Sequence, residues 1–457
     1  MNFSEFILAH SSEDPAALAL SRSRYAGEVA DFDLALTTLE VRRKLRDKVP
    51  EWYAVPSLVF PLRVSGEQCS STATARYKAS IAAPCTKTPV SVHGPSFSPA
   101  PCTESASPVY GKRIADLTGG LGVDSWAFAQ VFDQVLYNEM RPELADAAAH
   151  NFRELGVTNI TVRNCELGTG CPIKSGMTKG DPLVMAGPDR PSTVMEVLDG
   201  FNPDVLFLDP ARRAADGRKV FRLEECQPDV LKLLPELLEA CPRVLLKLSP
   251  MADITLVCKQ LGCVKEVHVV AADGECKELL LVLEKDWAGP YSITIVEDNA
   301  VLEIPGQARD EGNDVLDERV SSLIPAFEPG SPDQEASLFE PGKAMLKAGA
   351  FELPCWYGLA KLGQHTHLYT GAEVPEALKP FGKCFRILES APLDKRGIKS
   401  IGQKYPQADV TARNIPLTSD QLRAKLGVRS GGDIHIFGLH VDALRANLLF
   451  VAERRGG

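Results

Sequence analysis

The sequence feature that most constrains the fold is a regular alternation of strand and helix patterns between residues 112 and 286. The apolar run 204–208 is typical of a central parallel strand buried on both faces. Alternation of this kind predicts an α/β, Rossmann-like, doubly wound parallel sheet of seven strands with helices on both faces. The expected strands are 113–117, 134–138, 159–163, 204–208, 243–248, 264–271 and 278–283, and the expected helices are 124–132, 142–155, 224–240 and 252–261. The last two strands flank Asp273-Gly274 and should be antiparallel neighbours.

The chain is long enough for two or three domains, and its composition and periodicity change on both sides of this pattern. Residues 1–81 have helical periodicity, and Pro, Ser and Thr dominate the following stretch. A Gly- and Pro-rich segment at 170–200 reads as an inserted loop, and Asp298-Asn299 as the turn of a hairpin. The predicted parts are a helical N-terminal region (1–81), a linker (82–111), an α/β domain (112–286), a small β-rich segment that is a hairpin or ferredoxin-like (287–330), and a smaller α+β region (331–457).

The composition favours a cytoplasmic protein without a structural metal. No uninterrupted apolar run reaches the roughly 20 residues of a membrane span. The start of the chain lacks the basic and apolar stretches of a secretory signal. The 12 cysteines include no C-x-x-C pair, so neither a zinc site nor a disulfide framework is indicated.

Charge is distributed unevenly along the chain. The net charge is −10, but residues 341–457 carry 17 Lys+Arg against 10 Asp+Glu. An acidic body with a basic C-terminal part is one pattern of polyanion-binding proteins. An ordinary basic surface would give the same count, and the sequence leaves both readings open.

A glycine-rich turn, Asp116-Leu117-Thr118-Gly119-Gly120-Leu121-Gly122, follows the first strand. Glycines permit positive φ and remove Cβ atoms that would block a ligand. A dinucleotide site would use G-x-G-x-x-G, whereas this spacing is G-G-x-G, and the carboxylates of Asp116 and Asp124 would repel a pyrophosphate. They suit the ammonium and sulfonium cations of S-adenosylmethionine better. A tight turn without a ligand remains the alternative.

Glu139 stands at the tip of the second strand. A carboxylate at this place can accept hydrogen bonds from both ribose hydroxyls of a nucleotide. Together with the glycine turn, it favours a nucleoside-containing cofactor.

These residues resemble the motifs of class I S-adenosylmethionine-dependent methyltransferases. The glycine turn is similar to the first motif, Tyr137-Asn138-Glu139-Met140 to the second, and Asp209-Pro210-Ala211-Arg212-Arg213 to the fourth. The resemblance implies S-adenosylmethionine as the cofactor, with Thr118, the glycines and Met140 in its site. The third motif departs from the pattern, because Cys165 stands where an acidic residue usually contacts the adenine amine, with Glu166 as its substitute.

More narrowly, the chain resembles a group of bacterial methyltransferases with a THUMP-like C-terminal domain, which would then occupy residues 331–457. The residues that carry this likeness are Glu67-Gln68-Cys69-Ser70-Ser71, the run 116–124, Asp209 to Arg213, Leu248-Ser249-Pro250-Met251, Phe339-Glu340-Pro341-Gly342 with Lys347, Arg413-Asn414 and Gly431-Gly432-Asp433. THUMP domains bind RNA, so the resemblance implies RNA as the partner of the basic C-terminal region.

The fourth strand ends in the candidate catalytic residues Asp209, Pro210 and Arg212. Asp209 can orient a nucleophile or take its proton. The aromatic residue that follows Pro in base methyltransferases is missing, and Arg212 and Arg213 either contact a phosphate or base or brace the loop. Ser249-Pro250-Met251 follows the fifth strand where uracil-C5 methylation would need a cysteine, which favours direct transfer without a covalent intermediate.

Further substrate candidates lie on neighbouring elements. Lys247 either points to the cleft or pairs with a core carboxylate, and Gln68 and Ser71 either line the pocket or lie on exposed helix surface. The leading hypothesis is an RNA methyltransferase. Methylation of a protein or small molecule, and a non-catalytic cofactor-binding scaffold, are the alternatives.

Overall fold

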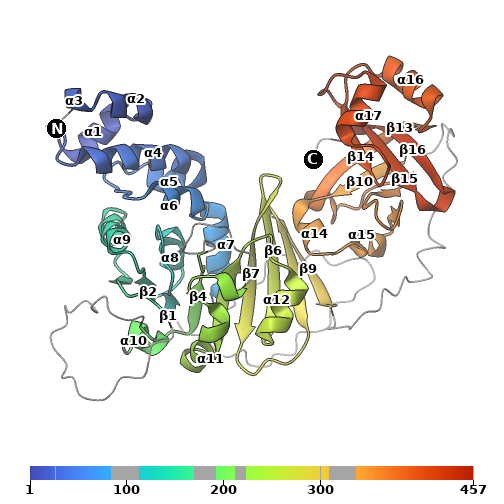
Figure 1. Ribbon diagram of the computed structural model, residues 1–457. Helices are drawn as coiled ribbons and strands as arrows, with labels where there is room; N and C mark the ends of the chain where they lie inside the picture. The colour runs from blue at the N-terminus through green and yellow to red at the C-terminus, as the bar shows by residue number, and fades with distance from the viewer. Residues whose placement is uncertain are drawn as a thin grey trace, which may run out of the picture. The chain divides into compact units, whose positions relative to one another are not determined.

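A computed structural model describes residues 1–25, 27–83, 113–168, 192–211, 223–298, 300–307 and 336–455. These residues form two compact units. The first contains the N-terminal helices and most of the α/β sheet, and the second contains the C-terminal sheet (Figure 1). Residues 84–111 of the predicted linker and most of the predicted inserted loop lie outside the described residues.

Five parallel strands in the order β3-β2-β1-β4-β5 form the centre of the first sheet. They are β1 (Arg113–Asp116), β2 (Gln134–Asn138), β3 (Ile160–Arg163), β4 (Val205–Leu208) and β5 (Arg243–Leu248). The order reverses between β1 and β4, so their carboxyl ends frame the crevice in which open α/β sheets bind ligands.

The antiparallel side of the sheet is also present. β7 (Glu275–Glu284) pairs antiparallel with β5, and β6 (Val264–Ala272) follows β7 in the sheet order. The turn between them has Asp273 at φ 53° and Gly274 at φ 72°. β8 (Tyr291–Glu297) and β9 (Ala300–Gln307) extend the order to nine strands. The predicted doubly wound α/β fold is confirmed, and the predicted hairpin joins the same sheet.

Helices connect the parallel strands. They are α8 (Val123–Phe128), α9 (Pro142–Glu154), α10 (Val194–Leu198), α11 (Val230–Ala240) and α12 (Ile254–Leu261). The predicted helix 224–240 begins later than expected, because Asp229 accepts a hydrogen bond from the Lys232 N–H and caps α11 there.

The predicted helical N-terminal region is confirmed. Its helices are α1 (Phe3–Ala9), α2 (Pro15–Leu20), α3 (Arg22–Tyr25), α4 (Phe32–Lys48), α5 (Pro50–Tyr53), α6 (Arg63–Gln68) and α7 (Thr72–Ala82). Helical periodicity continues through residues 68–81 of the sequence, but the chain breaks between α6 and α7. Ser71 caps α7 in a capping box with Thr74, so the helix cannot start earlier.

The second unit contains a seven-stranded sheet in the order β11-β12-β10-β13-β16-β15-β14. Its strands are β10 (Ser337–Pro341), β11 (Ala360–Lys361), β12 (Tyr369–Gly371), β13 (Gly382–Pro392), β14 (Asp409–Arg413), β15 (Ile434–Val441) and β16 (Ala446–Arg454), and its helices are α14 (Lys343–Lys347), α15 (Leu353–Trp356), α16 (Lys395–Lys404) and α17 (Ser419–Leu426). One face carries an apolar cluster that includes Phe385, Phe437 and Phe450. On the other face, Ile401 of α16 and Leu422 of α17 join a second cluster. The predicted α+β region is confirmed.

No helix among the described residues is long and apolar enough to cross a membrane.

Candidate functional site at the carboxyl ends of β1 and β4

The glycines of the turn after β1 have different physical roles. A Cβ on Gly119 would lie 2.1 Å from Cε2 of Tyr137, and one on Gly122 would lie 2.7 Å from Cζ of Phe152. Gly120, at φ 55°, has no atom nearer to such a Cβ than the Thr118 carbonyl oxygen, at 3.9 Å. A side chain at Gly119 or Gly122 would therefore meet an aromatic ring, whereas Gly120 leaves open space beside the turn, and Gly120 and Gly122 both have the positive φ expected from the sequence.

Asp116 ends β1 as a buried carboxylate. Its Oδ1 accepts from the Thr118 N–H at 3.1 Å, and its Oδ2 accepts from the Ser125 hydroxyl at 2.6 Å. Burial raises the pKa of Asp116 to about 8, although these two hydrogen bonds oppose the shift. The Thr118 hydroxyl accepts from the Asp209 N–H at 2.6 Å and so ties the end of β1 to the end of β4.

The raised pKa of Asp116 predicts a pH-dependent loss of stability. In the unfolded chain Asp116 releases its proton near pH 3.8, whereas in the folded protein it keeps the proton up to about pH 8. The contribution of Asp116 to the free energy of unfolding is therefore fully present below pH 3.8 and is lost as the pH rises toward about 8. Asp116→Asn removes the titration, and its unfolding free energy relative to wild type should rise by about 1.4 kcal/mol for each pH unit crossed. Urea unfolding of both proteins from pH 5 to pH 9 measures this difference. A difference that does not change with pH would show that Asp116 is not protonated in the folded state.

Glu139 is fixed beside the open side of the turn. Its Oε2 accepts from the Gly120 N–H and its Oε1 from the Arg141 N–H, both at 2.9 Å. Burial raises the pKa of Glu139. Each carboxylate oxygen has a second lone pair, so the group keeps the capacity to accept from a ligand.

Asn138 joins the turn to the loop after β3, a role that the sequence did not reveal. Its side-chain amide donates to the Leu117 and Cys165 carbonyls and accepts from the Cys165 N–H at 3.0 Å. Cys165 is consequently held half-buried next to the turn, whereas Glu166 is exposed. Met140 is also exposed, at 53% of its surface.

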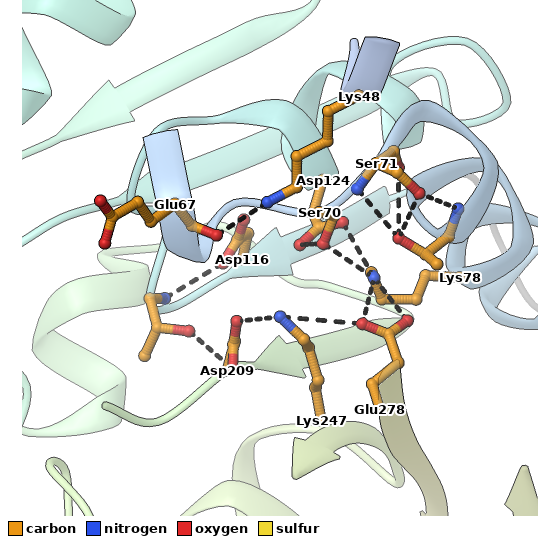
Figure 2. A network of polar contacts seen from close by, with 12 residues as sticks. Lys48, Glu67, Ser70, Ser71, Lys78, Asp116, Asp124, Asp209, Lys247 and Glu278 are labelled. Carbon is orange, nitrogen blue, oxygen red and sulfur yellow. Dashed lines mark hydrogen bonds and ion pairs between the residues drawn. The ribbon is translucent and has the colours of Figure 1, made fainter. Parts of the chain in front are cut away.

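Lys78, on α7, lies at the centre of a buried polar network (Figure 2). Its Nζ donates to both oxygens of Glu278 at 2.8 and 3.0 Å and to the Ser70 hydroxyl at 2.9 Å. It also lies 3.2 Å from Oδ1 of Asp124, whose Oδ2 accepts from Ser70 at 2.9 Å. The N-terminal helices thus contact the first helix after the glycine turn through charged and polar groups.

Lys247 extends this network to β4. Its Nζ lies 2.5 Å from Oδ2 of Asp209 and 3.8 Å from Oε2 of Glu278. Burial opposes the charge of Lys247, but Asp209 and Glu278 outweigh it and hold the pKa of this lysine above its usual value. Of the two readings of Lys247, the structure supports pairing with a carboxylate, and its partner is the candidate catalytic residue.

The network has an excess of negative charge. Asp124, Asp209 and Glu278 face the two ammonium groups of Lys78 and Lys247. Oδ1 of Asp124 is buried, and the ion pair with Lys78 is not accompanied by a hydrogen bond to this oxygen among the described residues. Carboxylates in excess suit a cationic ligand.

The other predicted site residues are placed as follows. Ser71 caps α7 and Gln68 is exposed at the end of α6, while the neighbouring Ser70 is the residue that enters the network. Pro210 is buried after Asp209. Arg212 and Arg213 lie outside the described residues.

Sequence reasoning missed Lys78 and Glu278. The available signal was a charged residue inside an apolar pattern. Glu278 stands at the start of the run Leu279–Leu283, and Lys78 stands between the buried Ala75 and Ala79. A buried charge needs a partner, and these two residues are 200 positions apart in the sequence.

Two family models match parts of the C-terminal half of the chain. Residues 338–378 match the family described as a ferredoxin-like domain, and residues 382–454 match the family described as THUMP domain-like. The crystal structure of a "putative methyltransferase" from Porphyromonas gingivalis W83 is similar over 99% of this chain and 98% of that chain, at 25% identity and a TM-score of 0.71. The chain is a methyltransferase-like protein with a THUMP-like C-terminal domain.

Parts of the methyltransferase-like protein are also similar to TrmK of M. capricolum in complex with S-adenosyl-homocysteine. That match covers 39% of this chain and 63% of that chain, at 10% identity and a TM-score of 0.25. A match to an rRNA methylase from Streptococcus thermophilus covers 38% and 87%, at 13% identity and a TM-score of 0.24. Similarities this low carry no argument about function. No curated protein matches the chain.

Proposed function

We propose that this protein is an S-adenosylmethionine-dependent methyltransferase that methylates RNA by direct transfer. One observation carries the proposal: the carboxyl ends of β1 and β4 bring the open Gly120, the carboxylate of Glu139 and the partly exposed Asp209 to one crevice. Crevices at this place bind ligands in open α/β sheets.

The residues present fit the cofactor. Glu139 would accept from the ribose hydroxyls, the backbone at Gly120 would allow close approach, and Asp124 would face the cationic end, with the buried Asp116 behind the turn. Cys165 would border the adenine. The bound cofactor supplies a methyl group on a positively charged sulfur.

Asp209 would act on the acceptor. Its side chain is 28% exposed, and Lys247 holds one carboxylate oxygen, which leaves the other to accept from an N–H or O–H of the substrate. Cys69 lies near the network, but burial raises the pKa of its thiol, which makes a thiolate nucleophile unfavourable. Alignment of acceptor and methyl group is then the main contribution of the protein.

The C-terminal unit supports RNA as the substrate. Lys395, Arg396 and Lys399 on α16, and Lys425 and Arg429 at and after the end of α17, are exposed. No carboxylate among the described residues forms an ion pair with any of these five cations. The two helices touch closely, since a Cβ on Gly402 would lie 2.0 Å from the Leu426 carbonyl oxygen. Adjacent helices with unpaired cations fit a phosphate backbone.

Neutralising this face should weaken RNA binding in a salt-dependent way. The triple variant Lys395→Gln, Arg396→Gln, Lys399→Gln removes up to three phosphate contacts. The slope of log affinity against log salt concentration should fall by roughly 2 to 3, because each contact contributes about 0.7 to 0.9. Fluorescence anisotropy with labelled tRNA between 50 and 200 mM salt provides the measurement.

A control variant with the same change in net charge distinguishes a specific RNA-binding site from a general effect of charge. The variant Arg24→Gln, Arg46→Gln, Lys259→Gln removes three exposed cations from the first unit and should keep the wild-type slope. Equal slopes for wild type and the α16 variant would argue against RNA contact through this face.

Transfer of a labelled methyl group tests the proposed function itself. Cells with and without the gene provide RNA for nucleoside mass spectrometry, and deletion-strain RNA is then incubated with the protein and labelled S-adenosylmethionine. We expect one modified nucleoside to be absent from the deletion strain and restored in vitro. Label that enters protein or small molecules instead would favour those acceptors, and cofactor binding without any transfer would favour a scaffold.

The assignment of 112–286 as the catalytic domain and 331–457 as the RNA-presenting THUMP-like domain is part of the same proposal. Deletion of residues 331–457 should abolish the affinity for RNA and leave the affinity for the cofactor unchanged.

A further inference from the structure

The sheet of the second unit is strongly curved on one face. Arg413 ends β14 and Glu340 lies on β10, and four strand-to-strand steps separate these strands in the sheet. At about 4.8 Å a step, a flat sheet would place them about 19 Å apart, farther than the two side chains reach together. Nevertheless Nη2 of Arg413 donates to Oε1 of Glu340 at 2.8 Å. The face that carries both residues is therefore concave.

Polar residues gather at one end of this concave face. Side chains two residues apart on a strand share a face, and the strand register aligns His435 with Asp409, and Glu340 with Lys383. Thr411 Oγ1 lies 2.7 Å from Nε2 of His435, whose ring stacks on Phe437 at a centroid distance of 4.1 Å. The rings of His435 and Phe437 therefore lie on the same face of the sheet as the charged groups.

Two buried polar atoms at this end have no hydrogen-bond partner among the described residues. They are Nε of Arg413 and Nδ1 of His367. His367 has φ 49°, a left-handed conformation that is uncommon for a residue other than glycine and is found at functional sites. Burial, and then the nearby cations Lys361, His365 and Arg413, lower the pKa of His367. A buried donor left unpaired costs about 1 to 3 kcal/mol, so a bound acceptor would stabilise it.

The charge balance indicates the kind of acceptor. Lys383, Arg413 and Arg454 share this face with Glu340 and Asp409, which leaves an excess of one positive charge. Asp409 is already engaged by the Gly431 N–H at 2.9 Å, and Glu340 by Arg413. Guanidinium N–H groups match phosphate oxygens in geometry as well as charge.

We propose that the concave end of the C-terminal sheet binds a phosphoryl group, with Arg413 Nε and Lys383 Nζ as its main donors. The group is a free phosphate or nucleotide, or the terminal phosphate of an RNA. Its residues all belong to the second unit, and phosphate binding there does not depend on methyl transfer.

Calorimetric titration of the full-length protein with inorganic phosphate tests the site. Arg413→Lys retains the charge next to Glu340 but removes the Nε–H, and we expect its affinity for phosphate to fall at least 10-fold. The matched control is Arg386→Lys, which alters the ion pair between Arg386 and Glu453 at 2.6 Å. Arg386 follows Phe385 on the same strand, so its side chain lies on the opposite face of the sheet. This control should keep the wild-type affinity.

A second variant and two oligonucleotides complete the design. Lys383→Met changes an exposed side chain, at 57%, and should also weaken phosphate binding without altering the melting temperature. Decaribonucleotides with a 5′-phosphate or a 5′-hydroxyl distinguish the source: an Arg413-dependent preference for the phosphorylated end identifies an RNA terminus, and equal binding of both identifies a free phosphate or nucleotide. Phosphate affinity that is the same in wild type, Arg413→Lys and Lys383→Met would overturn the proposal.

Discussion

Replacing Glu278 by glutamine is expected to reduce the unfolding free energy of the first unit by about 3–5 kcal/mol, the usual result of breaking a buried ion pair. Glu278 is almost fully buried between Lys78 and Lys247. The substitution preserves the shape of the side chain but leaves two buried ammonium groups with less compensating charge. Urea unfolding followed by tryptophan fluorescence measures the loss, because Trp52 and Trp126 pack against each other in this unit.

The same strand offers a matched control. Glu275 is also on β7, but its side chain is 75% exposed and it pairs with Lys277 at the surface. Glu275→Gln should leave the unfolding midpoint unchanged, because solvent screens exposed pairs. Equal effects of the two substitutions would mean that the buried network does not stabilise the fold.

Gly119→Ala is expected to cause the second large loss, about 3 kcal/mol or more, through overpacking. The added Cβ would lie 2.1 Å from the Tyr137 ring, whose hydroxyl is held by the Gly120 carbonyl at 2.6 Å and whose ring packs against Phe152. Since Gly119 is not among the positive-φ glycines, the cost arises from packing alone.

The variant Gly156→Ala distinguishes the energetic cost of overpacking from the cost of backbone strain. Gly156 has φ 69° and no atom within 4 Å of its Cβ position, so alanine there should cost only about 1 kcal/mol, from the left-handed conformation. Thermal unfolding of both variants provides the comparison. A Gly119→Ala protein as stable as wild type would show that Tyr137 can move away from the turn.

The succession of strands and helices along the chain, the position of the turn and the carboxylates at the strand ends could be predicted from sequence, because they depend on local patterns. A buried strand such as 204–208 reads as an apolar run, and Asp209 must follow it at the ligand-binding edge. The start of α7 at Thr72 depends on a side-chain cap, and periodicity alone does not detect it.

The partners of the site residues could not be predicted, since they are long-range contacts. From the sequence, Lys247 could either point to the cleft or pair with a core carboxylate. The structure shows that Asp209, at the end of the neighbouring strand, is its partner. Similarly, the sequence did not reveal that the rings of Tyr137 and Phe152 leave no space for a side chain at Gly119 and Gly122.

Equilibrium binding of S-adenosylmethionine to wild type and Gly120→Ala, measured by isothermal titration calorimetry, tests the central claim most directly. Alanine at position 120 meets no neighbouring atom closer than 3.9 Å, so the variant should fold at a cost of about 1 kcal/mol from its left-handed φ of 55°, yet its methyl group would enter the space proposed for the cofactor. We predict that wild type binds and that Gly120→Ala binds at least 10-fold more weakly. Equal affinities, or a folded wild-type protein that does not bind S-adenosylmethionine, would contradict the proposal.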